Sequence, residues 1–558
     1  MAYMKDSTGQ RLDTIEVQRV GTLAHAASQY VTTDGNDANN GRSWEKGKAT
    51  IQAAINALPV NGGKVYLGYG SHGVASYGRW TSSTFTSGSA TVADTSATSA
   101  DVGRWVISPN VPDLAQITSV VPGTSYTTTV PANVTGTIDT IITAPAIVIP
   151  AGVELVGLGS AWQDTLEVHY APQNSTTEIL DTGTGVTIIP KKFYLAANQS
   201  QDYMRVGLRD LTVRGQGTNM FGFFGENIWF GVATNVMFMS HGMAGAVLAY
   251  NMNSTAFRDC RFFGNGSATA TRVTGGALLS TPNSSASSSV QFDNCFFSNN
   301  YGFGVAGTNS RSTATWTKVS AINAGTLINC QFNHIETTTV VDSGTGAYIS
   351  GESGQGVLIG CWFETCALRP VMVSADPGAV TFISCHFNGA NGHGGNAQVC
   401  VLINNGQGSP RPSGAIYIGC YFRNATNSYI QVGSVSTVSW MGCQTDQATS
   451  SITFIAVNGG ENVPSSQAPG IGQVGRYSNK PYRTIAKCVA TGTSTLVAGT
   501  VAVADTAITA SSIVRLNRQT AGGTLGQLSV ALTAGTGFTI NSNSSSDTST
   551  IYYEVVSY

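Results

Sequence analysis

Apolar and polar positions alternate in a short motif that recurs along the middle of the chain. Each full copy holds a Cys followed two residues later by Phe, and most of the later copies carry an Ile two residues before the Cys. The Cys residues of the seven copies are Cys260, Cys295, Cys330, Cys361, Cys385, Cys420 and Cys443, and the last copy has no Phe. Apolar residues at every second position predict a β-strand with one buried face.

The spacing of the copies indicates how these strands are arranged. Successive Cys residues lie 23 to 35 positions apart, and no hairpin turn joins one copy to the next. Strands this short are stable only when they stack on similar strands, about 4.8 Å apart. Parallel stacking would place Ile, Cys and Phe in three columns inside a solenoid. The sequence therefore predicts an all-β, parallel β-helix whose rungs carry connecting loops of variable length.

The cysteines allow a second interpretation, a disulfide framework, because ten is an even number. Seven of them occupy one column of the expected solenoid, where Cβ atoms would lie about 4.8 Å apart along parallel vectors. A disulfide requires Cβ atoms about 3.8 Å apart. We therefore expect buried free thiols. No CxxC pair accompanies them, so a metal site is not expected.

The region before the repeats contains a short amphipathic segment. Residues 50–58 place Ile51, Ile55 and Leu58 on one face, with Thr50 as N-cap and Pro59 at the end, which predicts a helix. The full stretch T-I-Q-x-A-I-x-A-L-P-x-x-G-G-x-V-Y-L resembles the opening of the pectate-lyase-like β-helix domain of phage tail spikes. Residues 149–159 resemble its next rung. The resemblance implies a right-handed β-helix over residues 31–78 and 144–475, with the helix as its N-terminal cap.

Three further segments flank or interrupt the expected solenoid. Residues 79–143 carry short alternating runs and resemble a small β-domain inserted in other phage tail proteins; the alternative is one long loop. Residues 1–30 begin like actinobacteriophage tail proteins, which implies a segment that attaches to the tail, whereas the alternative is a flexible terminus. Residues 478–558 alternate between turn signals, which predicts a small antiparallel β-sandwich. This last module resembles a C-terminal knob shared among phage tail proteins.

Composition and charge argue against some classes of binding partner. Charged residues make up 10% of the 558 positions, and the formal net charge is −2, which argues against binding to nucleic acid or to an anionic membrane. The longest apolar stretch, residues 141–159, is interrupted by Pro145, Pro150 and Glu154, so membrane insertion is not expected. The N-terminus has no apolar run typical of a secretion signal. We expect synthesis in the host cytoplasm and assembly into the virion tail.

The residue after each Cys should point outward, as should the residue two positions later. Consecutive copies place Trp362, His386 and Tyr421 in the first outward column and Glu364, Asn388 and Arg423 in the second. Aromatic rings beside a carboxylate, an amide and a guanidinium suit a saccharide. The same mixture suits a trimer interface, where a partner would cover the aromatic rings. Plain exposed side chains are the third alternative.

Candidate catalytic groups carry a weaker signal. A glycoside hydrolase needs two carboxylates, and Glu364, Asp446 and Glu352 are the candidates that the expected rungs bring closest to one another. No Asp-Asp pair and no R-x-K signature of polygalacturonases occurs, and the His-Gly pairs at 241 and 393 are expected to be turn residues. No cofactor and no metal is indicated.

Together these features favour a phage tail spike or fibre that binds a glycan on the host cell surface. We expect a homotrimer whose N-terminus contacts tail or baseplate proteins. Two alternatives remain open, a polysaccharide depolymerase (hydrolase or lyase) on the same scaffold and a purely architectural tail component.

Overall fold

The structure is a computed structural model in which most residues from Ser28 to Ser557 are placed. The described residues are 28–557 without 61, 109, 112–114, 161, 164–167, 170–175, 192–205, 227–230, 250–254, 281–289, 309–318, 321, 324, 341, 351–355, 375–377, 390–398, 404–412, 426–427, 433–436, 446–452, 458–462, 465–473, 478–486, 507 and 511. The expected attachment segment therefore lies almost wholly outside the described residues. Within them, no helix has the length and apolar character needed to span a membrane.

The chain is almost entirely β-structure and divides into two compact units. The first comprises Met1–Ala415, Gly419–Ser436 and Thr445–Ala468, and the second comprises Ile416–Ile418, Thr437–Gln444 and Pro469–Tyr558. Strands β37 (Ser413–Ile418) and β41 (Gln444–Thr445) cross these boundaries. Each unit is described by itself.

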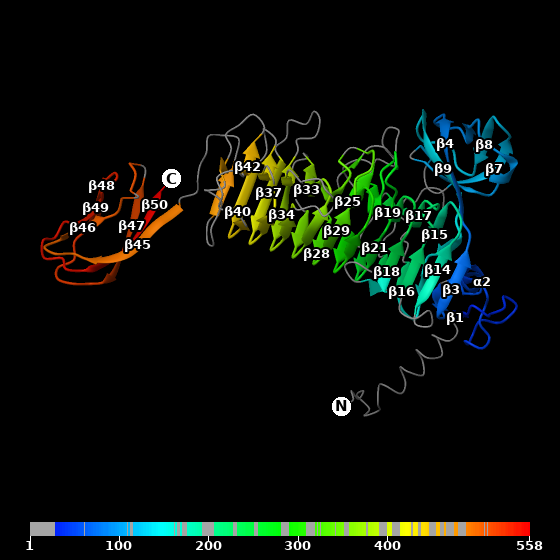
Figure 1. Ribbon diagram of the computed structural model, residues 1–558, viewed down its shortest axis with the longest axis horizontal. Coiled ribbons are helices and arrows are strands. Elements are labelled where there is room, and N and C mark those ends of the chain that lie inside the picture. The colour runs from blue at the N-terminus through cyan, green and yellow to red at the C-terminus, as the bar shows by residue number, and fades with distance from the viewer. Residues whose placement is uncertain are drawn as a thin grey trace, which may run out of the picture. The chain divides into compact units, whose positions relative to one another are not determined.

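Two long sheets of mainly parallel strands form the solenoid of the first unit (Figure 1). The first-unit strands of one sheet are β1 (Ser28–Val31), β2 (Gly63–Leu67), β3 (Gly70–Val74), β11 (Val153–Val156), β14 (Thr177–Asp181), β16 (Gly207–Arg214), β18 (Val232–Met239), β20 (Thr255–Arg258), β21 (Arg261–Phe263), β23 (Val290–Asp293), β24 (Phe296–Ser298), β28 (Thr326–Ile328), β29 (Gln331–Ile335), β31 (Val357–Ile359), β32 (Trp362–Cys366), β34 (Gly378–Ile383), β35 (His386–Asn388) and β38 (Tyr421–Arg423). The other sheet contains β10 (Ile147–Pro150), β15 (Val186–Lys191), β17 (Phe221–Glu226), β19 (Ala244–Ala249), β22 (Gly275–Ser280), β25 (Phe303–Thr308), β26 (Val319–Ser320), β27 (Ile322–Asn323), β30 (Thr345–Ser350), β33 (Arg369–Ser374), β36 (Val399–Ile403), β39 (Ser428–Val432), β42 (Thr453–Val457) and β43 (Val463–Pro464). The predicted all-β fold with long parallel sheets is confirmed.

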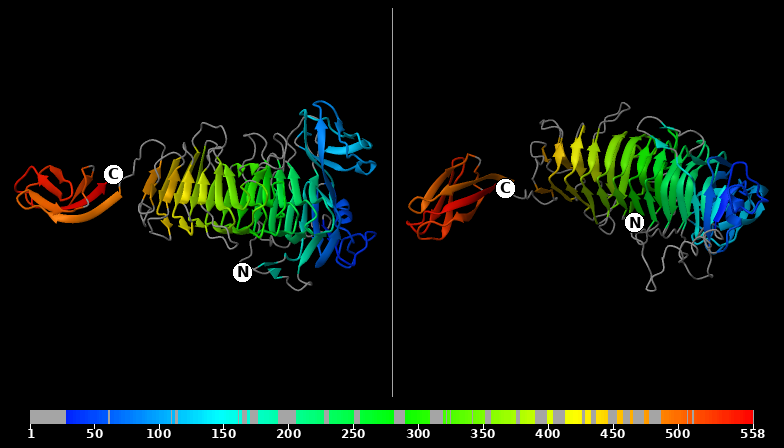
Figure 2. Two further views of the ribbon diagram at one scale, coloured as in Figure 1. Left: turned by 45° about the horizontal axis from the view of Figure 1, so that its top comes forward. Right: turned by 90° about the horizontal axis from the view of Figure 1, so that it is seen from below.

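The Phe column predicted from the repeats runs through the interior of the solenoid. Neighbouring rings stack nearly parallel, with centroids 4.8 Å apart for Phe297 and Phe332 and 4.6 Å apart for Phe332 and Phe363. The same stacking continues to Phe387 and Phe422. Figure 2 shows the stacked strands that carry these rings. One residue per rung thus supplies a continuous aromatic core.

The prediction of buried free thiols is also confirmed. The nine cysteines whose side chains the structure describes are free and buried. Within the repeat column each thiol lies near a backbone carbonyl of the preceding rung; the Sγ of Cys330, for example, donates to the oxygen of Phe292 at 3.4 Å. The column therefore packs as small apolar side chains that also satisfy backbone acceptors.

The predicted position of the Ile column is wrong. The residue before each Cys adopts the left-handed conformation, with φ of 50° at Asn329 and 61° at Gly360. This corner reverses the alternation, so that the buried residue lies three positions before the Cys, as at Leu327 and Leu358. Ile328 two positions before the Cys is consequently only half-buried and lies on the outer face. The same holds for Ile359 and Ile383.

Asp, Asn, Gly and Ser occupy this corner because their side chains tolerate a positive φ better than most. Where two carboxamide or carboxylate side chains follow one another, they also bond between rungs. Asn294 Nδ2 donates to Asp259 Oδ1 at 2.7 Å, and Asn235 Nδ2 donates to Asp210 Oδ1 at 2.8 Å. A second left-handed corner follows four residues after the Cys, for example at Thr365. In a rung with both corners, four residues lie between them, from the Cys to the third residue after it.

Two smaller elements precede the repeats. The helix α2 (Ile51–Asn56) begins after Thr50, whose hydroxyl accepts a hydrogen bond from Ala53 N, and its buried residues include Ile51 and Ile55. Gln52 exchanges hydrogen bonds with the backbone of Val148 in β10, which ties the helix to the second sheet. A short hairpin is formed by β12 (Trp162–Gln163) and β13 (Val168–His169).

A closed barrel interrupts the solenoid after β3. It is formed by β4 (Tyr77–Phe85), β5 (Thr91–Ala93), β6 (Trp105–Ile107), β7 (Ala115–Val121), β8 (Ser125–Thr128) and β9 (Gly136–Ala144), with the 3₁₀ turn η1 (Ser99–Asp101). Ile107 and Ile141 of the barrel pack in one cluster with Phe221 and Phe303 of the second sheet. Arg272, which precedes β22 of the second sheet, also contacts the barrel. Its guanidinium lies 3.2 Å from the carboxylate of Asp139 in β9 and over the ring of Trp80 in β4.

The second unit contains two antiparallel three-stranded sheets. They are β45 (Lys487–Thr495), β50 (Thr550–Ser557) and β47 (Ile513–Thr520), and β46 (Thr500–Ala504), β49 (Gly537–Ser542) and β48 (Leu528–Thr533). Strands β40 (Thr437–Met441) and β44 (Val474–Tyr477) also pair in this unit. Asp547, with its side chain fully covered, accepts hydrogen bonds from Ser549 and Ser542, and these hold its pKa well below the ordinary value. Asp547 thereby ties several turns of this module together.

A buried polar ladder lines one corner of the solenoid. The Nε2 atom of His241 donates to the carbonyl oxygen of Val213 at 3.1 Å, because a carbonyl can only accept. Its Nδ1 atom then accepts from Asn219 Nδ2 at 2.7 Å, and its backbone N–H donates to Asn265. Complete burial lowers the pKa of His241 to about 4. His241 is therefore neutral at pH 7 and is a structural residue of the turn.

Replacing one ring of the Phe column tests how much the column stabilises the solenoid. We expect Phe332→Ala to lower the free energy of unfolding by about 3–5 kcal/mol, because it removes a fully buried ring between two stacked neighbours. Phe296→Ala is the matched control, since Phe296 is an outward, half-buried Phe of the preceding rung, and it should cost about 1 kcal/mol or less. Urea unfolding followed by circular dichroism measures both values. Equal losses would contradict the assignment of the column as the core.

The neutral His241 predicts a pH dependence of stability. Between pH 6.5 and about 4 the unfolded chain binds a proton at this residue and the folded chain does not. The free energy of unfolding should therefore fall as the pH falls through this window, by about 3 kcal/mol from this group. His241→Gln should reduce the slope of stability against pH by one proton, whereas His72→Gln, which removes a different buried His, should leave the contribution of His241 in place. An unchanged slope in His241→Gln would refute this account.

Candidate functional site

The candidate site lies on the outer face of three consecutive rungs, on the strands that follow the Cys. Strands β32, β35 and β38 pair in parallel, with Trp362 beside His386 and His386 beside Tyr421. The second residue of each strand is the inward Phe, so the residues on either side of it leave the core. The structure thus brings together the aromatic residues singled out from the sequence. We call Trp362, His386 and Tyr421 the aromatic ladder.

The rings of the aromatic ladder are in direct contact. The centroids of Trp362 and His386 are 4.2 Å apart in a T-shaped arrangement, and those of His386 and Tyr421 are 5.0 Å apart. Trp362 is 43% exposed, which is high for the most hydrophobic member of the set. His386 and Tyr421 are half-buried. The ladder therefore presents an aromatic surface to solvent at one end and packs on itself at the other.

Glu364 holds the second outward column together. Its carboxylate accepts hydrogen bonds from Trp362 Nε1 at 3.2 Å and from Asn388 Nδ2 at 3.3 Å. Arg423 completes the set with an ion pair at 3.3 Å, in which both side chains are about one-third exposed. The carboxylate thus fixes the indole edge of Trp362 and the guanidinium of Arg423 relative to each other.

Asn388 is a support within the site. It is only 4% exposed, and both of its polar side-chain atoms have a polar partner: Nδ2 donates to Glu364, and Oδ1 accepts from Asn424 Nδ2 at 2.9 Å. Asn424 was not identified from the sequence. Its position four residues after Cys420, where other copies also place left-handed residues, is the signal that would have found it. Asn424 therefore holds Asn388, and Asn388 in turn holds the carboxylate of Glu364.

His386 is neutral at pH 7. Burial between its two aromatic neighbours lowers its pKa, the positive charge of Arg423 lowers it further, and the negative charge of Glu364 partly opposes both. Among the described residues, no hydrogen-bond partner reaches its buried Nε2 atom. The neutral imidazole packs in a T-shaped contact with Trp362 within the ladder.

The structure describes only one of the three candidate catalytic carboxylates. Glu364 lies in the ladder face, whereas Glu352 and Asp446 lie outside the described residues. In the part of the chain that the structure describes, no group of three or more His, Cys, Asp or Glu side chains is arranged to hold a metal ion. Glu364 is already engaged by three donors, so its arrangement suits positioning of its neighbours.

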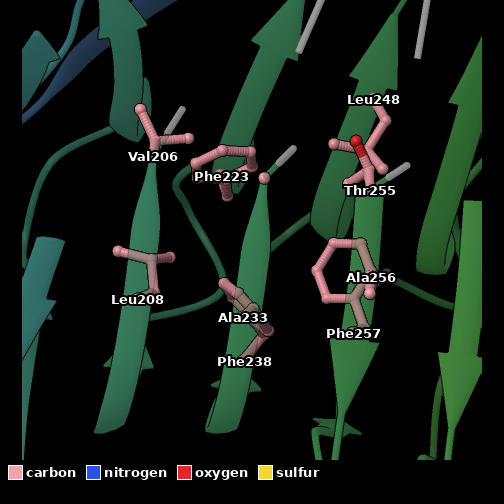
Figure 3. A pocket seen from close by; sticks show the side chains of 10 residues that line it. Val206, Leu208, Phe223, Ala233, Phe238, Leu248, Thr255, Ala256 and Phe257 are labelled. Atoms are coloured by element: carbon pink, nitrogen blue, oxygen red, sulfur yellow. The ribbon is translucent and has the colours of Figure 1, made fainter. Parts of the chain in front are cut away.

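A small apolar cavity lies elsewhere, inside the solenoid. It has a volume of about 20 Å³ and is lined by residues that include Leu208, Phe223, Phe238 and Phe257 (Figure 3). Figure 3 shows only one polar side-chain atom among the lining residues, the hydroxyl of Thr255. A cavity of this kind is a packing gap between rungs, because a substrate site needs convergent polar groups.

Comparisons with known proteins give one match to a family and several distant structural likenesses. Residues 489–556 match the family described as K1 capsule-specific polysaccharide lyase, C-terminal domain. No curated protein matches the chain. This family match covers the C-terminal module of the second unit.

The solved structures that resemble the chain are polysaccharide enzymes and phage tailspikes. The catalytic unit of a thermostable GH87 α-1,3-glucanase from Streptomyces thermodiastaticus is 10% identical, with a TM-score of 0.35 over 69% of this chain and 84% of that one. A tailspike protein of Acinetobacter baumannii bacteriophage Fri1, a capsular polysaccharide depolymerase, is 11% identical, with a TM-score of 0.32 over 74% and 77%. The tailspike of Pseudomonas phage LKA1 is 12% identical, with a TM-score of 0.27 over 89% and 85%. Scores this low do not transfer an activity to this chain.

The charges around His386 predict opposite effects of two substitutions. Arg423→Gln should raise the pKa of His386, because it removes a positive charge, and Glu364→Gln should lower it, because it removes a negative one. NMR titration of protein labelled with ¹³C at histidine Cε1 measures both shifts. The buried His72 is the internal control and should titrate identically in all three proteins. Shifts of the same sign in the two variants would refute the assigned geometry.

Proposed function

We propose that this chain is a receptor-binding phage tail spike that holds a polysaccharide of the host cell surface against the aromatic ladder. The observation that carries the proposal is the contact of three rings on consecutive rungs, edged by the ion pair of Glu364 and Arg423. Aromatic surfaces with a few fixed polar groups are typical of ligand sites in proteins. The ladder offers both on a rigid sheet.

The chemistry of the ladder matches that of a sugar chain. The faces of pyranose rings carry C–H groups, which pack on aromatic rings, and their edges carry hydroxyls, which bond to charged and amide groups. Trp362 supplies the exposed ring, and Arg423 and Glu364 supply donors and acceptors at its border. Because Glu364 and Asn388 hold these groups in place before binding, little side-chain freedom is lost when the ligand docks.

The C-terminal module supports the same class of ligand. The family that it matches is named for lyases that act on a capsular polysaccharide, which is a glycan of the cell surface. We assign the module, residues 478–558, as a knob at the distal end of the spike.

The rest of the chain is assigned by the same proposal. Residues 1–30 attach the spike to tail or baseplate proteins, helix α2 caps the solenoid, and residues 79–143 form an inserted domain. The solenoid itself, residues 31–78 and 144–475, assembles as a homotrimer in the virion tail. Measurement of the mass of the purified full chain tests the trimer directly.

A depolymerase is the second candidate function, and the family match to a polysaccharide lyase favours it. Incubation of the purified chain with host envelope polysaccharide would reveal it through new reducing ends or unsaturated uronates. Binding without any product supports the receptor function alone. If the chain neither bound the polysaccharide nor formed product, the proposal would be overturned and the architectural tail component would remain.

Removal of the exposed ring tests the glycan site. Trp362→Ala should weaken binding to the host polysaccharide at least tenfold, about 1.4 kcal/mol, because it removes the largest exposed face of the ladder. Biolayer interferometry with immobilised polysaccharide measures the change.

The matched control is Trp44→Ala, since Trp44 is 37% exposed and belongs to a loop of the N-terminal region. It should bind as the wild type does. Equal affinities of wild type and Trp362→Ala, with the wild type binding, would refute the ladder as the site.

A further inference from the structure

The outer face of the rungs just before the left-handed corner changes character along the solenoid. In two successive rungs, the outward residue next to the corner is charged, Arg258 and then Asp293. In the next three rungs this position and the one two residues before it carry only aliphatic and Thr side chains. We call this set the aliphatic stripe: Thr326, Ile328, Val357, Ile359, Thr381 and Ile383.

The stripe is continuous over three rungs and half-buried. Ile328 pairs with Ile359, and Ile359 with Ile383, in direct parallel register. All six side chains are half-buried, since they stand on the outer face of β28, β31 and β34. In the sequence, the next copy of the motif keeps Ile at the same two positions, Ile416 and Ile418. A line of β-branched apolar residues facing water is unfavourable unless a partner covers it.

We propose that the aliphatic stripe is the face through which copies of this chain contact one another in the homotrimer. This inference rests on the assembly named in the proposed function and identifies the surface that forms it. The stripe has no charged side chain, and its hydrogen-bonding groups are the two Thr hydroxyls. A sugar, a nucleic acid or a charged protein segment would find few groups there to bind.

The periodicity of the stripe selects a second copy as the partner. Its side chains repeat at the rung spacing of about 4.8 Å, so a surface that matches them over several rungs must have the same repeat. Copies related by an axis parallel to the solenoid place equivalent rungs at equal heights. Aliphatic faces of two sheets then interdigitate about 10 Å apart, as in the core of a β-sandwich.

The charge pattern marks where the contact begins. Side chains that stand beside a threefold axis meet their own copies, so a column with Arg258 or Asp293 at the axis would bring like charges together. From Ile328 onward the stripe has no charged side chain, so this repulsion between copies is absent. Asp293 and Ile328 are paired in register on neighbouring rungs. The proposed contact between copies therefore begins at the rung of Ile328.

Introduction of charge into the stripe tests the inference. Light scattering of the full wild-type chain at micromolar concentration should give three times the chain mass of 58.0 kDa. The double variant Ile328→Arg with Ile383→Arg should give the mass of one chain, because it places like charges around the axis in two rungs. Gln291→Arg is the matched control on the same face outside the stripe, and it should keep the wild-type mass. Far-UV circular dichroism should show the same β-content in all three.

A covalent test covers the case in which the arginine variant does not fold. Ile359→Cys replaces one half-buried aliphatic residue by a smaller one, and a short bismaleimide should link its copies into a band of higher mass on denaturing gels. Gln291→Cys should not crosslink, and neither should the wild type, in which the nine thiols that the structure describes are buried.

The outcomes separate the two levels of the proposal. A trimeric wild type with an unaffected arginine variant and no crosslink overturns the aliphatic stripe while the trimer stands. A monomeric wild type overturns both. Loss of trimer in the folded arginine variant, or a crosslink specific to Ile359→Cys, supports the stripe.

Discussion

The left-handed residue before each Cys determines which side chains of the solenoid are buried. Without it, the alternation of inward and outward residues would continue through the Cys. The residues that precede the corner would then exchange sides, inward for outward. With it, Leu327 enters the core and Ile328 faces outward, while Cys330 and Phe332 remain inside. The cost of a positive φ is small for Asn, Asp and Gly, and the stacking of identical corners spreads the constraint over many rungs. The aliphatic stripe faces outward because of this corner.

The sequence was sufficient to predict the parallel stacking, the Phe column and the free thiols, since these depend on residues that repeat at fixed offsets. It was also sufficient to place Trp362, His386 and Tyr421 side by side, because they follow the Cys on the same side of the corner. The Ile column was misplaced because strict alternation was extended across a position that is not extended. The residues at that position, Asn329 and Gly360 among them, already indicated a turn.

Other features of the site depend on contacts that no spacing reveals. The engagement of Glu364 by Trp362, Asn388 and Arg423 follows from side-chain reach across three rungs. The burial of Asn388 likewise depends on Asn424, which lies beyond the second corner. Docking of the barrel on the second sheet through Ile107 and Ile141 is a tertiary contact of the same kind.

Unequal spacing of the repeats accompanies equal stacking of the rungs. Cys361 and Cys385 are 24 positions apart and Cys385 and Cys420 are 35 apart, yet the Phe rings that follow them stack at 5.4 and 4.9 Å. Length added to a connection is therefore absorbed outside the stacked strands. A lineage of such proteins can exchange or lengthen those connections, and so diversify what surrounds the ladder, while the scaffold that aligns its rings is inherited unchanged.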